Sequence, residues 1–134
     1  MPKVILFREE HSPRVMVEKV DFISAPGTSP PGIHRPGGPV ALLTSKCLFG
    51  FDPAGRPGFT LRSLHPGHDL AEVRAATGFA FAEREETPET PGPDAATLAL
   101  MRGRVIDELA ETYPAFAADW RRDLAADAAE EPRT

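Results

Sequence analysis

The sequence has a single cysteine, no long apolar run and no clustered basic segment. One cysteine, Cys47, excludes an internal disulfide. A membrane-spanning helix needs about 20 successive apolar residues, and no run in the chain approaches that length. Only four apolar residues lie between Lys3 and Arg8, so the amino terminus does not resemble a signal peptide. These features predict a cytoplasmic protein that does not enter a membrane.

Positive charge is also scarce, and the formal net charge is −5 at pH 7. Binding to nucleic acid needs lysines and arginines gathered on one face. The pairs Arg102/Arg104 and Arg121/Arg122 lie among carboxylates, which is typical of a solvated helix face. We therefore expect no nucleic-acid partner.

Proline and glycine are abundant, with 15 and 11 copies in 134 residues. The pattern predicts short elements joined by rigid turns within a chain long enough for one hydrophobic core. Residues 24–39 hold five prolines and four glycines and are interpreted as a long irregular loop. Residues 83–93 are acidic and rich in proline, which favours an extended linker.

Several stretches before this linker predict an α/β fold with a mixed sheet. Residues 4–7 are all apolar, as in a strand that is buried on both faces. Residues 14–22 form a longer candidate strand with a bulge at residues 18–19. Residues 40–44, 47–52 and 59–64 are expected to be strands that include a hairpin, and residues 79–81 a last short strand. Asp69 and Glu72 resemble a capping box that begins a helix, and Gly78 would end it.

From Asp94 onward the apolar spacing becomes helical. A first stripe comprises Leu98, Met101, Val105, Leu109 and Thr112, and a second, after Pro114, comprises Phe116, Trp120 and Leu124. Tryptophan is costly to expose and is enriched at interfaces, so the second stripe is either a partner interface or packs on the chain's own sheet. We expect residues 1–92 to form the α/β part and residues 93–134 a helical extension whose acidic tail frays.

Two groups of residues are candidates for a chemical site. His65-Pro66-Gly67-His68 places two imidazoles three positions apart, but zinc needs further ligands, so we interpret this segment as a turn that leads into a helix and expect no metal. Cys47 lies in an apolar strand run, where a buried structural thiol is favoured over a nucleophile.

The charged residues Glu18, Lys19 and Asp21 suggest either acid–base chemistry or, as we favour, a salt-bridged strand edge. The loop Ser24-Ala25-Pro26-Gly27 follows them, at the expected carboxyl end of a strand, where ligands gather in open α/β sheets. We take Ser24, Ala25, Pro26 and Gly27 as a candidate loop near a substrate. No residue carries a catalytic signature.

Four segments in a fixed order carry a family resemblance: residues 14–27, 37–44, 49–52 and 61–79. They are similar to the later half of the β subunits of family I CoA-transferases, particularly those of the glutaconate CoA-transferase type. Residues 14–27 resemble that family's segment ending in a Ser/Thr-Ser-Pro-Gly loop, and the other three resemble the strands, hairpin and helix that follow it. The resemblance covers roughly residues 3–101 and corresponds to the carboxy-terminal portion of such a β chain.

This resemblance implies a NagB/RpiA/CoA-transferase-like α/β fold with the active site between two related domains or subunits. The family's transferases use a glutamate that attacks the acyl-CoA and forms a glutamyl-CoA thioester, beside a glycine-rich backbone that stabilises the oxyanion. Glu9, Glu10 and Glu18 lack the glycine context of that nucleophile, so none receives its role.

The resemblance therefore implies a hetero-oligomer in which a partner supplies the glutamate. That partner would be a CoA-transferase-like α subunit, an amino-terminal β-type chain, or both. Coenzyme A would be part of the substrate, and no covalently bound cofactor is expected. Relatives of this fold also include CoA-thioester hydrolases, ring-opening enzymes and decarboxylases, so the reaction class stays open. A non-catalytic scaffold that docks through its carboxy-terminal helices is the alternative from a different class.

Overall fold

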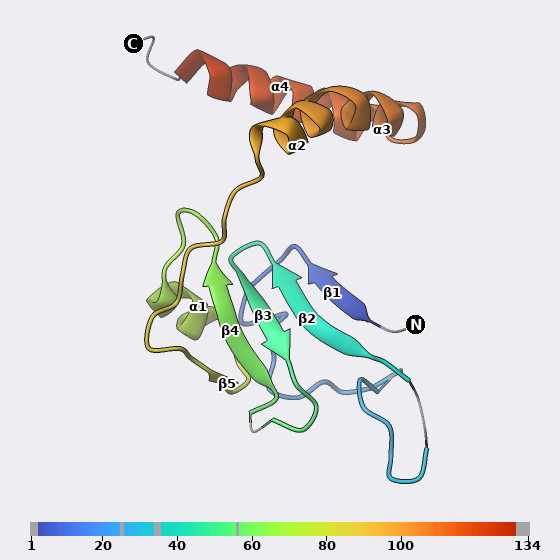
Figure 1. The fold of residues 1–134 in the computed structure, drawn as a ribbon, viewed down its shortest axis with the longest axis vertical. Coiled ribbons are helices and arrows are strands. Elements are labelled where there is room, and N and C mark those ends of the chain that lie inside the picture. The colour runs from blue at the N-terminus through green and yellow to red at the C-terminus, as the bar shows by residue number, and fades with distance from the viewer. Residues whose placement is uncertain (1–2, 25, 34–35, 56, 131–134) are drawn as a thin grey trace. The chain divides into compact units, whose positions relative to one another are not determined.

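The chain divides into two compact units, Met1–Thr90 and Pro91–Thr134, each described by itself. A computed structural model describes residues 3–24, 26–33, 36–55 and 57–130, and the side chains among them up to residue 126. The first unit contains the sheet and one helix, and the second contains only helices (Figure 1). Within these described ranges, no helix combines the length and the apolar character needed to cross a bilayer.

The first unit is built on a five-stranded mixed sheet, which confirms the predicted fold class (Figure 1). Its strands lie in chain order: β1 (Val4–Arg8), β2 (Pro39–Thr44), β3 (Cys47–Phe51), β4 (Phe59–Leu64) and β5 (Phe81–Ala82). β3 is antiparallel to both β2 and β4, whereas β1 is parallel to β2 and β5 is parallel to β4. The hairpin predicted from the turn at residues 53–58 is the β3–β4 pair.

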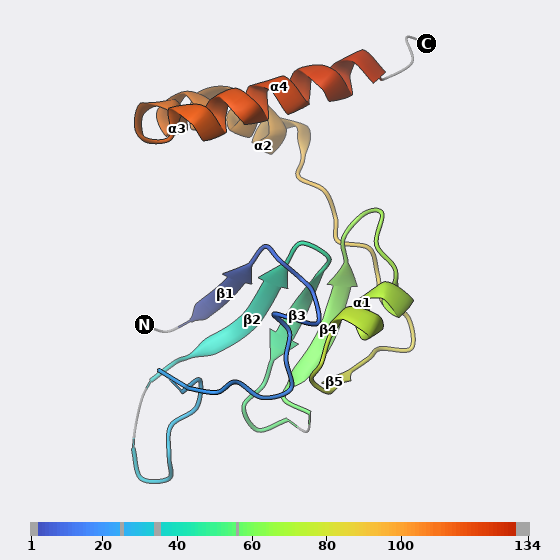
Figure 2. The same ribbon diagram turned by 180° about the vertical axis from the view of Figure 1, so that it is seen from behind.

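The core lies under α1 (Leu70–Ala76), which packs on one face of the sheet on the side of β4 and β5 (Figure 2). Cys47, Phe49, Leu61 and Val73 are fully buried there. Phe49 is central, because its ring contacts those of Phe79 and Phe81 at centroid distances of 5.8 and 5.1 Å in edge-on geometry. α1 begins as predicted, with the Asp69 side chain accepting a hydrogen bond from the Glu72 amide at 2.8 Å.

The strand predicted at residues 4–7 is present as β1, but the prediction that it is buried on both faces is wrong. Ile5, Leu6 and Phe7 are exposed. β1 lies at the end of the sheet order, so its only neighbouring strand in the described part of the chain is β2. The apolar run at residues 4–7 therefore predicts the strand correctly, but it does not predict that the side chains of the strand are exposed.

The strand predicted at residues 14–22 is not formed. Ser12 begins a turn in which its carbonyl accepts the amides of Val15 and Met16 at 3.0 and 2.9 Å, and the chain then continues without strand pairing. Met16 alone is buried. The charged residues at 18, 19 and 21 are exposed and belong to no strand, so the proposed salt-bridged strand edge is also wrong.

The acidic, proline-rich segment is only partly a linker. The Leu64 amide donates to the Pro88 carbonyl at 3.0 Å, and the Thr90 amide donates to the Leu64 carbonyl at 2.6 Å. Residues 88–90 thus lie along the end of β4 and belong to the first unit.

The second unit contains α2 (Ala95–Leu100), the π-helical turn η1 (Met101–Val105), α3 (Ile106–Thr112) and α4 (Pro114–Glu130). Its most buried side chains are Ile106 and Ala117. Val105 on the predicted stripe is only half-buried, because the extra residue of the π turn rotates the following helix and brings Ile106 inward. Arg121 of α4 donates to Asp107 of α3 at 2.6 Å.

Gly78 follows α1 at the predicted position, but close packing is what requires it. A Cβ at residue 78 would lie 2.7 Å from the Met16 carbonyl oxygen, and the Gly78 amide donates to that same oxygen at 2.5 Å. The backbone of residue 16 therefore leaves no room for a side chain at residue 78.

We predict that Gly78→Ala lowers the free energy of unfolding by about 1–3 kcal/mol, because a backbone atom has to move to admit the methyl group. Urea unfolding measures the change. Gly27→Ala is the matched control, since its Cβ would meet only the Pro39 side chain at an ordinary 3.4 Å. Equal stability of the two variants would contradict the packing described for Met16.

Candidate functional site

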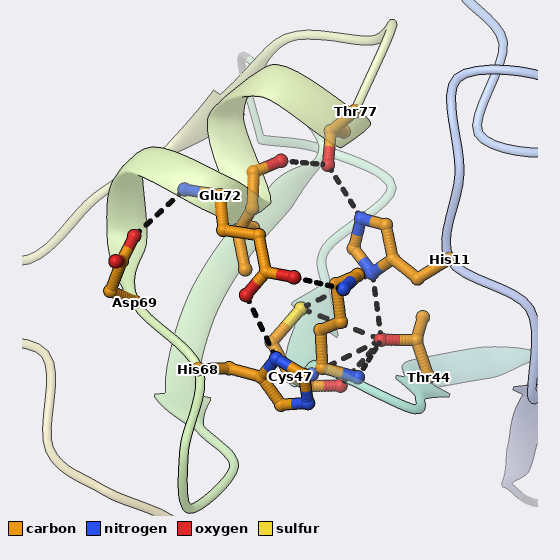
Figure 3. Close-up of polar contacts among 9 residues, drawn as sticks. His11, Thr44, Cys47, His68, Asp69, Glu72 and Thr77 are labelled. Atoms are coloured by element: carbon orange, nitrogen blue, oxygen red, sulfur yellow. Dashed lines mark hydrogen bonds and ion pairs between the residues drawn. The ribbon is translucent and has the colours of Figure 1, made fainter.

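A buried polar network joins the segment after β1 to the β2–β3 turn and to the end of α1 (Figure 3). His11 is at its centre and is only 5% exposed. Its Nδ1 lies 2.9 Å from Thr44 Oγ1, and its Nε2 lies 2.9 Å from Thr77 Oγ1. The imidazole thus ties together three parts of the first unit that are remote in sequence.

The hydrogen bonds fix the tautomer of His11. The Thr77 hydroxyl donates to the Val73 carbonyl at 2.7 Å, so its oxygen accepts from the Nε2–H of His11. Nδ1 of the neutral ring is then an acceptor for the Thr44 hydroxyl, whose single proton also has the Cys47 carbonyl as an acceptor at 3.1 Å. Burial lowers the pKa of His11, and the positive charge of Lys46 lowers it further. A neutral imidazole fits this arrangement, with one ring nitrogen donating and the other accepting.

Thr44 also shapes the turn between β2 and β3. Its hydroxyl oxygen accepts the amides of Lys46 and Cys47 at 3.2 and 3.1 Å. The same oxygen that orients His11 therefore closes the turn that positions Lys46.

Glu72 is the charged centre next to this network (Figure 3). It forms an ion pair with Lys46 and accepts a hydrogen bond from His68 Nδ1 at 2.8 Å. The hydrogen bond from Lys46, and then that from His68, lower the pKa of Glu72 to about 2. The carboxylate thus joins the β2–β3 turn to the first turn of α1, and its partners occupy both of its oxygens.

Cys47 is fully buried, as predicted, and its environment disfavours a thiolate. Its Sγ lies 3.6 Å from Thr44 Oγ1 and 3.9 Å from His11 Nδ1. Burial raises the pKa of the thiol to about 11. The neighbouring imidazole is already engaged by Thr44, so it is not available as a base.

The two histidines of the predicted turn form hydrogen bonds with different residues. His65 bonds to Thr90 Oγ1 at 2.8 Å and to the Thr44 carbonyl at 3.0 Å, whereas His68 bonds to Glu72. Among the residues that the structure describes, no group of three or more histidine, cysteine or acidic side chains is arranged to hold a metal ion.

The predicted substrate loop lies away from the polar network. Ser24, Pro26 and Gly27 are exposed, and Ala25 lies outside the described residues. Gly27 lies at the amino end of β2, near Gly38 and Pro39, whereas Thr44 ends the same strand. The expectation that this loop follows the carboxyl end of a strand is wrong, because residues 9–24, directly before it, form no strand.

In the second unit, Phe116 and Trp120 lie together on α4, with ring centroids 5.9 Å apart. With Asp119 and Asp123 they line a shallow pocket of about 240 Å³. Phe116 is 58% exposed, whereas Trp120 and Leu124 are half-buried, and Leu124 does not line the pocket. Two of the three residues of the predicted interface stripe thus form one exposed aromatic surface.

Sequence reasoning did not find the network around His11. Thr44 and Thr77 lie 33 and 66 positions from it, and an isolated histidine followed by Ser-Pro carries no local pattern. The only local signal was the capping box, which placed Glu72 at the start of α1.

We predict that Cys47 is nearly inert in the folded chain. With a pKa of about 11, only about one thiol in a thousand is ionised at pH 8, and burial hides that fraction as well. Labelling with iodoacetamide at pH 8 should be at least about a hundredfold slower in the native chain than in 6 M guanidinium, since the thiolate is the reacting species. Rapid labelling of the native chain would show that the thiol is accessible and activated.

We also predict that the free energy of unfolding falls over two separate pH ranges, one for His11 and one for Glu72. The pKa of His11 is lowered from 6.5, so unfolding takes up a proton and stability falls as the pH drops below about 6.5. The pKa of Glu72 is lowered from 4.5 to about 2, so its contribution to the free energy of unfolding is complete above pH 4.5. That contribution is lost as the pH falls from 4.5 to about 2. Urea unfolding from pH 8 to pH 3 measures both. Glu72→Gln should flatten the acid range but keep the fall in stability below about pH 6.5, because the charge of Glu72 raises the pKa of His11 and its removal lowers that pKa further. A profile that His11→Gln leaves unchanged above pH 5 would contradict the role of the buried imidazole.

No protein-family model matches the chain. The chain is 36% identical, over 106 residues, to the B subunit of 3-oxoadipate CoA-transferase from Pseudomonas knackmussii, in a match that covers 74% of this chain and 39% of that one.

Solved structures show the same fold. Glutaconate coenzyme A-transferase from Acidaminococcus fermentans matches with a TM-score of 0.60 and 25% identity over 74% of this chain and 40% of that one. The decarboxylase AibA/AibB matches with a TM-score of 0.56 and 31% identity over 73% of this chain and 36% of that one. The chain thus spans about two fifths of the length of these relatives. In sequence and in fold the chain is therefore similar to a part of CoA-transferase B subunits.

Proposed function

We propose that the chain is a component of a hetero-oligomeric CoA-transferase-like enzyme that acts on acyl-CoA thioesters and carboxylic acids. The observation that carries this proposal is the 36% identity to the B subunit of a 3-oxoadipate CoA-transferase. The fold shared with glutaconate coenzyme A-transferase supports it independently. Coenzyme A is then part of the substrate, and the cytoplasmic location expected from the sequence stays a prediction.

In this proposal the catalytic glutamate comes from a partner, either a CoA-transferase-like α subunit or an amino-terminal β-type chain. The state of three glutamates of this chain supports that assignment. Hydrogen bonds from Lys46 to Glu72, from Ser12 to Glu10 and from Arg74 to Glu83 lower the pKa of each carboxyl. A carboxylate stabilised in this way is a poorer nucleophile toward a thioester.

This chain would contribute part of the sheet and the loop of Ser24, Ala25, Pro26 and Gly27 near the CoA or acyl group. The exposure of the described residues of that loop supports the role, because a substrate has to reach them. The surface of Phe116, Trp120 and Leu124 is proposed as a partner interface, since an exposed aromatic pair is typical of binding surfaces.

A second candidate reaction is decarboxylation or another lyase or hydrolase reaction on a CoA thioester. The 31% identity to the decarboxylase AibA/AibB supports it over nearly the same share of the chain. The two candidates differ in whether an acceptor acid is needed.

The test is an assay of the chain together with its co-purified partners on a panel of acyl-CoA thioesters, with and without a free carboxylic acid. A transferase forms a new acyl-CoA only when the acid is present. Product without any acceptor would establish the second candidate, and no activity with any thioester would contradict both. Ser24→Glu should raise the KM for acyl-CoA about tenfold by repelling its phosphates, whereas Thr112→Glu, with the same charge on the helical unit, should not.

A further inference from the structure

The outer edge of β1 is the most exposed apolar feature of the first unit. Ile5, Leu6 and Phe7 are 65%, 47% and 68% exposed, although all three are large apolar side chains in a strand. β1 ends the sheet order, and α1 lies at the other side of the sheet, near β4 and β5 (Figures 1 and 2). Among the described residues of the first unit, one edge and both faces of β1 are therefore open.

The composition of β1 does not suit a solvent-exposed edge. Side chains alternate along a strand, so Ile5 and Phe7 lie on one face and Leu6 lies on the other. Edge strands in native proteins are usually protected by inward charges, proline or a bulge, whereas the only charge within β1 is Arg8 at its end. A strand that is apolar on both faces is typical of the interior of a sheet with helices on both sides.

The free backbone groups of β1 limit which kind of segment can bind along its outer edge. An edge strand leaves amides and carbonyls that another strand pairs with, and a helix has no matching row of free groups. The chain's own helices therefore cannot complete this edge. Among the described strands, β2, β3 and β4 have neighbours on both sides, and the other edge strand, β5, is only 2 residues long. A second copy would pair the edge, but its β1 has the same uncovered faces and would leave both apolar faces open.

The relatives indicate where a suitable strand would come from. The matches cover only 39%, 40% and 36% of the relatives' chains, so most of each relative lies outside the part that this chain resembles. We infer that β1 pairs with a strand of a separate chain that carries the remainder of a CoA-transferase B-type subunit, and that this chain covers both faces of β1. The inference rests on the proposed function and assigns the surface through which its partner binds.

The test uses the full chain with Ile5→Lys and Phe7→Lys together. Both side chains are already exposed, so the isolated double variant should melt as the wild type does. The matched control is Ile33→Lys with Tyr113→Lys, an aliphatic and an aromatic residue that are 53% and 61% exposed elsewhere. Each tagged chain is expressed in the native cell, and the captured partners are identified by mass spectrometry. Their affinities are then measured with purified chains.

The expected result is that the wild type and the control bind a CoA-transferase-type chain, and that the β1 variant binds it at least a hundredfold more weakly. Equal binding by all three chains would overturn the assignment of β1 and leave the proposed function standing. A homodimer that only the β1 variant disrupts, with no CoA-transferase-type chain captured, would overturn both.

Discussion

The hydroxyl group of Thr44 is the contact on which the order of the first unit depends. It donates to His11 and accepts the amides of Lys46 and Cys47, so it fixes both a buried imidazole and a chain reversal. Through His11 it reaches Thr77 at the end of α1, and through Lys46 the turn reaches Glu72 at the start of α1. Both ends of the helix are thereby attached to the same β-turn, which holds Val73 over the core.

The neighbouring edge strand, β1, has no comparable organisation. Around Thr44 each buried polar group has a partner, whereas β1 presents three apolar side chains and a free backbone edge to solvent. Such a contrast is expected where part of a larger fold keeps its own core but not its neighbours. It agrees with a match that covers about two fifths of the related subunits. The open edge of β1 and the similarity to these subunits thus support the same proposal from separate observations.

Local patterns predicted the local parts of the structure. The hairpin, the start of α1 and the two late helices depend on turn residues, capping and periodicity, all of which lie within a few positions. The strand proposed at residues 14–22 failed because apolar residues with a phase shift do not reveal the turn at Ser12 or the single anchor at Met16. The His11 network depends on contacts between residues that are far apart in the sequence. The exposure of β1 depends on the absence of such contacts among the described residues. The spacing of apolar residues along the chain predicts neither. The family resemblance supplied the fold, but it did not place the loop of residues 24–27 at the amino end of β2.

In the proposed assembly, the sheet of this chain continues into another chain at β1. Hydrogen exchange of the β1 amides is the decisive measurement, in the isolated chain and in the assembly purified from its native cell. We expect the β1 amides that do not bond to β2 to exchange quickly in the isolated chain and at least about tenfold more slowly in the assembly, as in paired strands. Equal exchange of these amides in both samples would contradict it, because an edge that stays open in the assembly receives no strand.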